Sequence, residues 1–285
     1  MVKRKTKKTI YFILILCVFA IAVGTVITQS IWRGKSTNEK LDIIFNRTVN
    51  NKQVFDMAIN IESADGKFSY KNSAGNMKEN SPFAIASITK MFTAAVVFNL
   101  MDSGQLSLDD TIEQFFDKSD IDQLHMYKGI DYTGTITVGQ LLSQTSGLPD
   151  YYTEKTGDGT SFEEELVKKD TAITFEEILE RSKKLEAHFV NGTEGEAYYS
   201  DLNFDLLGKI AEKVSGEKLE ILYDKYIIKP LTLESTYLSQ TDSSFAPIYM
   251  GKEKVSRHQK YLVIPGLQAV LHFTVRQSRF SSSEP

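Results

Sequence analysis

The sequence of 285 residues predicts a mixed α/β fold, and two kinds of hydrophobic pattern support this. Apolar and polar residues alternate from Phe55 to Ile61, with the period of two that is typical of a half-buried β-strand. Longer apolar runs at 91–101 and 206–214 have the length and spacing of helices. Hydrophobic residues make up 41% of the chain and charged residues 25%, which is typical of a globular protein.

The N-terminal segment predicts contact with a membrane. Residues 3–8 are basic, and residues 10–27 carry no charge over about the length that crosses the hydrocarbon core of a bilayer. We therefore expect residues 1–33 to form a basic N-terminus and one transmembrane helix, in the membrane through residues 10–31. The basic flank places the rest of the chain outside the cytoplasm. A cleaved signal peptide and a secreted protein are the alternative.

The overall charge and the cysteine content exclude several function classes. The net charge is −4 although residues 3–8 hold five lysines and arginines, so the remainder is distinctly acidic. An acidic body argues against nucleic acid as a partner. The single cysteine, Cys17, allows neither an internal disulfide nor a cysteine-based metal site. No cofactor and no metal are predicted.

A β-hairpin is predicted before the first long helix. Residues 34–53 are polar and are interpreted as a linker leading into a first helix. The strand at 55–61 is followed by Asp65 and Gly66, a dipeptide that favours a hairpin turn. Alternation resumes at Phe68 and Tyr70. We interpret this hairpin as scaffold.

Ser87 and Lys90 stand at the start of the helix predicted over 91–101, for which Gly104 is the stop signal. Positions i and i+3 share a face of a helix, so the hydroxyl and the amine would lie side by side. A desolvated lysine gives up its proton more easily, and a neutral amine can take the proton of a serine hydroxyl. The S-x-x-K pattern alone is weak evidence for serine acyl transfer.

Further helices are predicted between irregular stretches. Residues 117–135 have no regular pattern, whereas residues 137–142 favour a short helix that leads into a turn-rich loop. Thr174 and Glu177 form the capping box of a later amphipathic helix. The helix at 206–214 is predicted to end at Gly216, and the next helix ends at Pro230.

Several motifs occur in the order found in one enzyme family. They are the helix start at 86–95, the segment at 104–110, the loop at 141–149 and Tyr199-Ser200-Asp201. Through these segments, from about residue 54 to 256, the chain resembles the serine hydrolases of the class C β-lactamase and penicillin-binding-protein family, which includes D,D-carboxypeptidases and related esterases. Residues 86–95 resemble the nucleophile helix of that family.

The resemblance implies a fold and a set of site residues. The fold would be β-lactamase/transpeptidase-like, a helical region beside an antiparallel sheet flanked by helices. Ser87 would be the nucleophile, Lys90 would help to deprotonate it, and Tyr199 would serve as general base and acid. Asp201 would contact substrate, because it falls on the last position of the family's Tyr-x-Asn motif. The Ser87 N–H and a second N–H from a C-terminal strand would form the oxyanion hole.

Two positions within the matching segments differ from the family pattern. Gln144 stands where the family usually has histidine. Asp201 stands where asparagine is more frequent, and an ionised carboxylate cannot donate a hydrogen bond to a substrate carbonyl. A carboxylate near Lys90 would also keep that lysine charged. The difference at Asp201 concerns the substrate rather than the fold.

The third motif of the family is missing at its expected place. None of the four histidines begins a His-x-Gly, and Lys155-Thr156-Gly157 precedes Tyr199 without a strand pattern, so we interpret it as a coincidence. The resemblance stops near residue 256, and residues 257–285 form an atypical tail. The hypothesis is a C-terminally truncated product, for which a frameshift is one explanation. Its open sheet edge would leave marginal stability and weak or absent turnover.

The sequence thus predicts a membrane-anchored, extracytoplasmic serine hydrolase with its domain at 54–256. It would form an acyl-enzyme on a small-molecule or peptidoglycan-type substrate, a peptide, a β-lactam or an ester. One alternative is a non-catalytic sensor module that binds penicillin or peptidoglycan, and another is an inactive truncated fragment.

Overall fold

The computed structural model describes residues 31–49, 54, 56–168, 173–238, 249–250 and 253–254. The chain divides after Asn76 into two compact units, Met1–Asn76 and Met77–Pro285, and each is described by itself.

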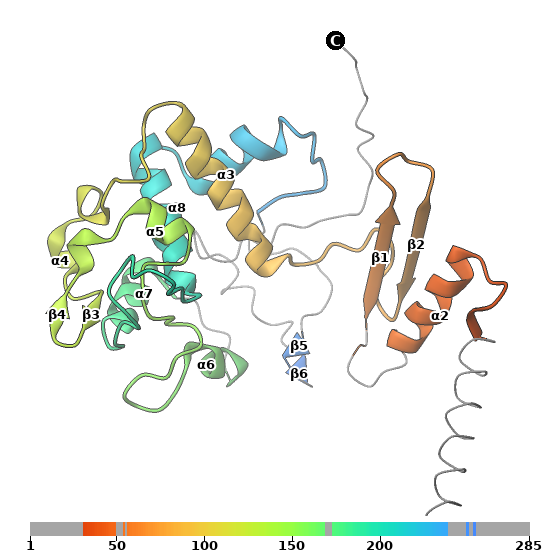
Figure 1. Ribbon diagram of the computed structural model, residues 1–285, viewed down its shortest axis with the longest axis horizontal. Coiled ribbons are helices and arrows are strands. Elements are labelled where there is room, and N and C mark those ends of the chain that lie inside the picture. The colour runs from red at the N-terminus through yellow and green to blue at the C-terminus, as the bar shows by residue number, and fades with distance from the viewer. Residues whose placement is uncertain are drawn as a thin grey trace, which may run out of the picture. The chain divides into compact units, whose positions relative to one another are not determined.

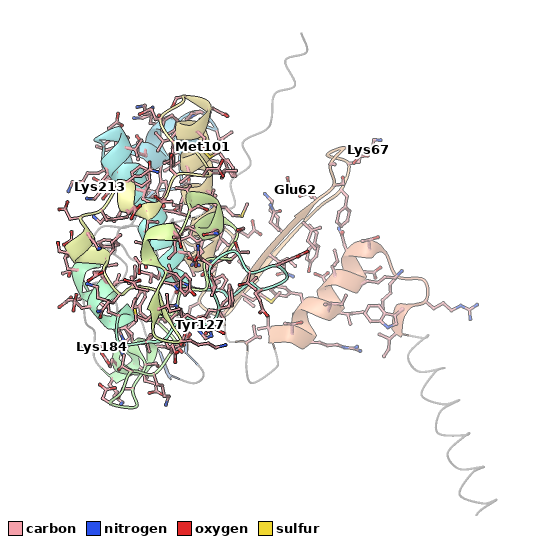
Figure 2. All side chains as sticks on the ribbon, turned by 60° about the vertical axis from the view of Figure 1, so that its left-hand side comes forward. Glu62, Lys67, Met101, Tyr127, Lys184 and Lys213 are labelled. Carbon is pink, nitrogen blue, oxygen red and sulfur yellow. The ribbon has the colours of Figure 1, made fainter. Side chains whose placement is uncertain are left out.

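The first unit contains a helix and the predicted hairpin (Figure 1). Strand β1 (Met57–Glu62) pairs antiparallel with β2 (Ser69–Ala74), and Gly66 has a φ of 68° in the turn between them. Lys67 lies at the tip of this hairpin (Figure 2). Helix α2 (Thr37–Val49) lies inside the stretch interpreted as a linker, and Asp42 on it accepts a hydrogen bond from the Tyr70 hydroxyl on β2 at 2.9 Å. The hairpin prediction is confirmed.

The second unit is built around two helices that lie side by side, α3 (Thr89–Asp102) and α8 (Asp201–Ser215) (Figure 1). Their buried apolar residues belong to one continuous core. Both helices end where the sequence predicted, because Gly104 and Gly216 adopt the left-handed φ values of 72° and 71° that favour glycine after a helix. The core thus fixes the N-terminal ends of α3 and α8, where the motif residues lie.

Short elements surround this helix pair. The capping box predicted for Thr174 with Glu177 is formed, and Thr137 with Gln140 forms another. The stretch at 117–135 is more regular than its sequence suggested, since it contains a short helix and a two-stranded ribbon. The remaining elements are α4 (Lys118–Ile121), β3 (Met126–Tyr127), β4 (Ile130–Asp131), α5 (Val138–Leu142), α6 (Phe162–Lys168), α7 (Phe175–Ser182), α9 (Leu219–Tyr223), the π-helical turn η4 (Asp224–Ile228), β5 (Tyr249–Met250), β6 (Glu253–Lys254) and the 3-10 turns η1 (Ala86–Ile88), η2 (Ile112–Gln114) and η3 (Thr133–Thr135).

The fold class expected from the sequence is corrected in one respect. It included an N-terminal transmembrane helix, but every helix among the described residues is too short or too polar to cross a membrane. Residues 1–30, on which that expectation rested, lie outside the described residues. The tail at 257–285 lies outside them as well.

Replacing Gly147 with alanine is expected to lower the free energy of unfolding by more than about 1 kcal/mol. Gly147 has a φ of 73°, and an added Cβ would lie 2.3 Å from the carbonyl oxygen of Phe189. Gly104→Ala is the matched control, since Gly104 has a similar φ with nothing within 4 Å of the added carbon. Chemical denaturation of both variants measures the effect of the contact. Equal losses in the two variants would contradict the predicted clash.

Candidate active site

Ser87 and Lys90 lie at the start of the buried helix α3. Ser87 is in the turn η1, after Ala86, whose φ of 45° is unusual for a residue other than glycine and indicates local backbone strain. The Lys90 Nζ donates a hydrogen bond to the Ser87 Oγ at 3.2 Å. Ser87 is exposed, whereas Lys90 is only 6% exposed. A reagent can therefore reach the hydroxyl, while the amine beside it is largely removed from water.

Tyr199 completes a cluster with these two residues. It precedes Ser200, the N-cap of α8, and its hydroxyl donates a hydrogen bond to the Ser87 Oγ at 2.9 Å. The Lys90 Nζ lies 5.1 Å from the centroid of the Tyr199 ring. At 54% exposure, the Tyr199 side chain is half in solvent. Lys90 and Tyr199, which belong to two separate motifs, thus both form a hydrogen bond with the Ser87 hydroxyl.

Asp201 forms a buried ion pair with Lys90. Its Oδ1 lies 2.7 Å from the Lys90 Nζ, and Asp201 is 5% exposed. Burial acts to lower the pKa of Lys90, but the charge and hydrogen bond of Asp201 outweigh it, so that the Lys90 pKa lies above its ordinary value. Lys90 is therefore an ammonium at neutral pH. The expectation that desolvation frees its amine is wrong, and the charge-holding effect of Asp201 prevails.

Two further carboxyl groups lie behind this pair, and sequence reasoning did not single them out. Burial raises the pKa of Asp201. The positive charge of Lys90 acts against this rise, and the negative charge of Asp150 adds to it. Burial also raises the pKa of Asp205 well above its ordinary value, and the charge of Asp201 adds to this. Asp205 lies one helical turn after Asp201 and is completely buried. The spacing of four residues was no clear sequence signal, because α8 also carries the polar residues Asn203, Lys209 and Glu212.

Replacing Asp205 with asparagine is expected to stabilise the protein increasingly as the pH rises. Because the pKa of Asp205 is raised in the folded state, its favourable contribution is complete below the ordinary carboxyl range and is lost as pH rises through the folded value. Asparagine cannot ionise and avoids that loss. Melting curves from pH 4 to pH 8 should show a difference that grows to roughly 2–4 °C. A constant difference, or the same trend in the exposed control Asp109→Asn, would contradict this.

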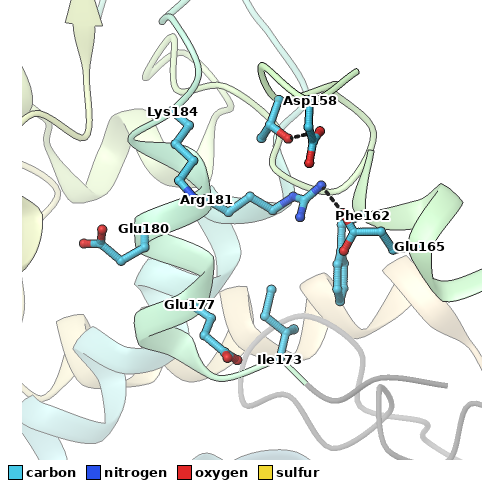
Figure 3. Close-up of a pocket in the computed structure, with 9 residues that line it drawn as sticks. Asp158, Phe162, Glu165, Ile173, Glu177, Glu180, Arg181 and Lys184 are labelled. Atoms are coloured by element: carbon cyan, nitrogen blue, oxygen red, sulfur yellow. Dashed lines mark hydrogen bonds and ion pairs between the residues drawn. The ribbon is translucent and has the colours of Figure 1, made fainter. Parts of the chain in front are cut away.

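Other features of the described residues do not extend this site. No group of three or more His, Cys, Asp or Glu among them is arranged to hold a metal ion. A cavity of about 300 Å³ contains none of the four predicted site residues (Figure 3). Arg181 crosses it to pair with Glu165 at 2.9 Å and donates a hydrogen bond to the Thr160 carbonyl. We interpret these contacts as a structural tie between α7, α6 and the loop before α6.

The Lys-Thr-Gly tripeptide lies in this loop, outside any strand, as its sequence context indicated. Lys155 is 58% exposed at its side chain and pairs with Glu164 at 2.7 Å. The proposed oxyanion donor on a C-terminal strand and the missing third motif concern residues that the structure largely leaves undescribed. These two points stay predictions.

Comparison with known sequences gives one consistent family. The beta-lactamase family model matches residues 52–262. Protein flp of Staphylococcus aureus (strain NCTC 8325 / PS 47) is 33% identical over 167 residues, which cover 56% of this chain and 28% of that protein. Esterase EstB of Burkholderia gladioli is 22% identical over 236 residues, 79% of this chain and 58% of that protein. The chain therefore matches little more than a quarter of the first relative's length.

Solved structures give the same answer about the fold. A penicillin-binding protein homologue from Pyrococcus abyssi, described as octameric, superimposes with a TM-score of 0.65 and 25% identity over 84% of this chain and 54% of its own. A D-stereospecific amidohydrolase from Streptomyces sp. gives a TM-score of 0.55 and 25% identity over 73% of this chain and 62% of its own. The described residues thus have a β-lactamase-like α/β fold.

Proposed function

Because the chain belongs to the beta-lactamase family, whose members of this type are serine hydrolases, we propose that it hydrolyses an amide or ester bond through an acyl-enzyme on Ser87. The observation that carries the proposal is the convergence of Lys90 and Tyr199 on the Ser87 hydroxyl, at 3.2 and 2.9 Å. A nucleophile within hydrogen-bond reach of a base, and a third group orienting that base, are the parts that covalent catalysis needs.

In the proposed reaction, Tyr199 transfers the proton of the Ser87 hydroxyl, and Lys90 supplies a positive charge. The Ser87 oxygen attacks the substrate carbonyl as its proton passes to the Tyr199 oxygen, which has first released its own proton to solvent. Tyr199 then protonates the leaving amine or alcohol. Water attacks the acyl-enzyme with Tyr199 again as base, which releases the acid and frees Ser87. Lys90, kept charged by Asp201, stabilises the negative charge that develops on the substrate. Asp201 as a substrate contact remains part of this proposal.

The names of the relatives suggest three substrate classes. These are amides of D configuration, penicillin-type β-lactams, and esters. Turnover of one member of each class by the purified chain, with Ser87→Ala beside it, tests the proposal. Hydrolysis that disappears in Ser87→Ala supports a hydrolase. Stable modification of Ser87 without turnover would favour the binding or sensor module instead. If Ser87 is not modified and no substrate is turned over, both the hydrolase and the sensor module are contradicted.

We also propose that the domain acts outside the cytoplasm. The support is the sequence alone, in which basic residues 3–8 precede the uncharged residues 10–27, a pattern typical of exported proteins. Protease treatment of intact cells that produce the full chain with a C-terminal tag tests this. Loss of the tag signal is expected. Complete protection until the cells are lysed would contradict the proposal.

A further inference from the structure

Gln144 contacts the chain on both sides of Tyr199. Its backbone carbonyl accepts a hydrogen bond from the Tyr198 N–H at 2.9 Å. Its side-chain Oε1 accepts another from the Ser200 N–H, also at 2.9 Å. One residue of the 143–150 loop therefore holds the two N–H groups that flank Tyr199, and the backbone of Tyr199 cannot turn without losing one of these bonds.

The Gln144 side chain is itself held in place from α8. The Asn203 Nδ2 donates a second hydrogen bond to the Gln144 Oε1. Asn203 is completely buried, and its Oδ1 accepts a hydrogen bond from the Ser146 hydroxyl at 2.6 Å. The amide oxygen of Gln144 is thus fixed relative to the first turn of α8, on which Asp201 lies.

The backbone of Gln144 indicates that its side chain is required. Its φ of 60° is in the left-handed region, where glycine or asparagine is favoured over glutamine. Such a conformation persists only where surrounding contacts impose it. Tyr199, by contrast, is half exposed, and among the described residues its side chain contacts Ser87 and Lys90. The position of its hydroxyl therefore depends on its backbone.

We propose that Gln144 is the positioning residue of Tyr199, which keeps the tyrosine hydroxyl within hydrogen-bond distance of the Ser87 Oγ. This inference rests on the proposed function, because it assigns Gln144 to the same proton transfer. Gln144 does not touch the reacting atoms and acts through the peptide units at 198 and 200. A displacement of about 1 Å in a reacting group can lower a rate about 100-fold.

The test compares Gln144→Met, Gln144→Glu and the control Gln105→Met in the full chain, with a fluorophosphonate as the probe. Methionine keeps the length of the side chain and removes the acceptor, whereas glutamate keeps an acceptor for both donors. Gln105 is exposed, and its side chain donates a hydrogen bond to the Ser103 hydroxyl. We expect the maximal rate of Ser87 modification to fall about 100-fold in Gln144→Met, with little change in the half-saturating probe concentration. Gln144→Glu should stay within about tenfold of the wild type.

A second measurement separates this inference from the proposed function. With 3-fluorotyrosine incorporated, the Tyr199 fluorine signal, identified by its absence in Tyr199→Phe, should be unchanged in Gln144→Glu and shifted or broadened in Gln144→Met. A wild-type rate in Gln144→Met, equal impairment of the methionine and glutamate variants, or an unchanged fluorine signal would overturn the positioning role. If the wild type reacts with no probe, the proposed function fails, and the fluorine signal still decides the role of Gln144.

Discussion

Lys90→Met is expected to lower the free energy of unfolding by about 3–5 kcal/mol at neutral pH, since it leaves a buried carboxylate without its partner. Lys90 and Asp201 are 6% and 5% exposed, and their charged atoms lie 2.7 Å apart. The negative charge of Asp150 raises the pKa of Asp201 further, so the unpaired Asp201 gains nothing from this neighbour. Denaturant titration of the wild type and the variant measures the loss.

Two further variants test whether the loss of stability comes from the buried Lys90–Asp201 pair. Lys90→Met combined with Asp201→Asn should recover most of the lost stability, because neither charge remains. Lys225→Met removes one partner of the surface pair with Glu217 and should leave the unfolding curve unchanged. The loss in Lys90→Met should also shrink in acid, where Asp201 takes up a proton. A double variant as unstable as Lys90→Met would contradict this account of the pair.

Tyr199→Phe is expected to lower the rate of Ser87 modification by about 10²–10⁴-fold while leaving the fold intact. Phenylalanine keeps the ring near Lys90 but removes the hydroxyl that lies 2.9 Å from the Ser87 Oγ. Because this hydroxyl belongs to a half-exposed side chain, its loss should change the melting temperature little. Stopped-flow or quenched reactions with a fluorophosphonate measure the rate.

Tyr127→Phe is the matched control for this substitution. The Lys128 ammonium lies 4.9 Å from the centroid of the Tyr127 ring, much as Lys90 lies over Tyr199. Tyr127 makes no recorded contact with Ser87 within the described ranges, so its hydroxyl should not affect the reaction. Equal rates for the two phenylalanine variants would show that the Tyr199 hydroxyl takes no part in activating Ser87.

The sequence predicted the elements whose signals are local. The ends of α3 and α8 follow from Gly104 and Gly216, and the capping box of α7 follows from Thr174 and Glu177. The pairing of β1 with β2 follows from alternation around one turn. Such signals depend on neighbours along the chain and need no knowledge of tertiary packing.

The electrostatics of the site could not be predicted with the same success. S-x-x-K alone suggested a lysine that loses its proton through burial, whereas the structure places Asp201 against it and reverses the direction of the pKa shift. The burial of Asp205 and the contacts of Gln144 with residues 198–203 arise from packing between segments more than fifty residues apart. No local pattern encodes such contacts.

Intact-mass spectrometry of the folded chain after incubation with a fluorophosphonate or an acylating β-lactam tests most directly whether Ser87 is an activated nucleophile. The arrangement of Lys90 and Tyr199 around its hydroxyl predicts a mass gain of one probe molecule, located on Ser87 by peptide mapping and absent from Ser87→Ala. No gain in the folded wild type, or an equal gain in Ser87→Ala, would contradict the proposed chemistry.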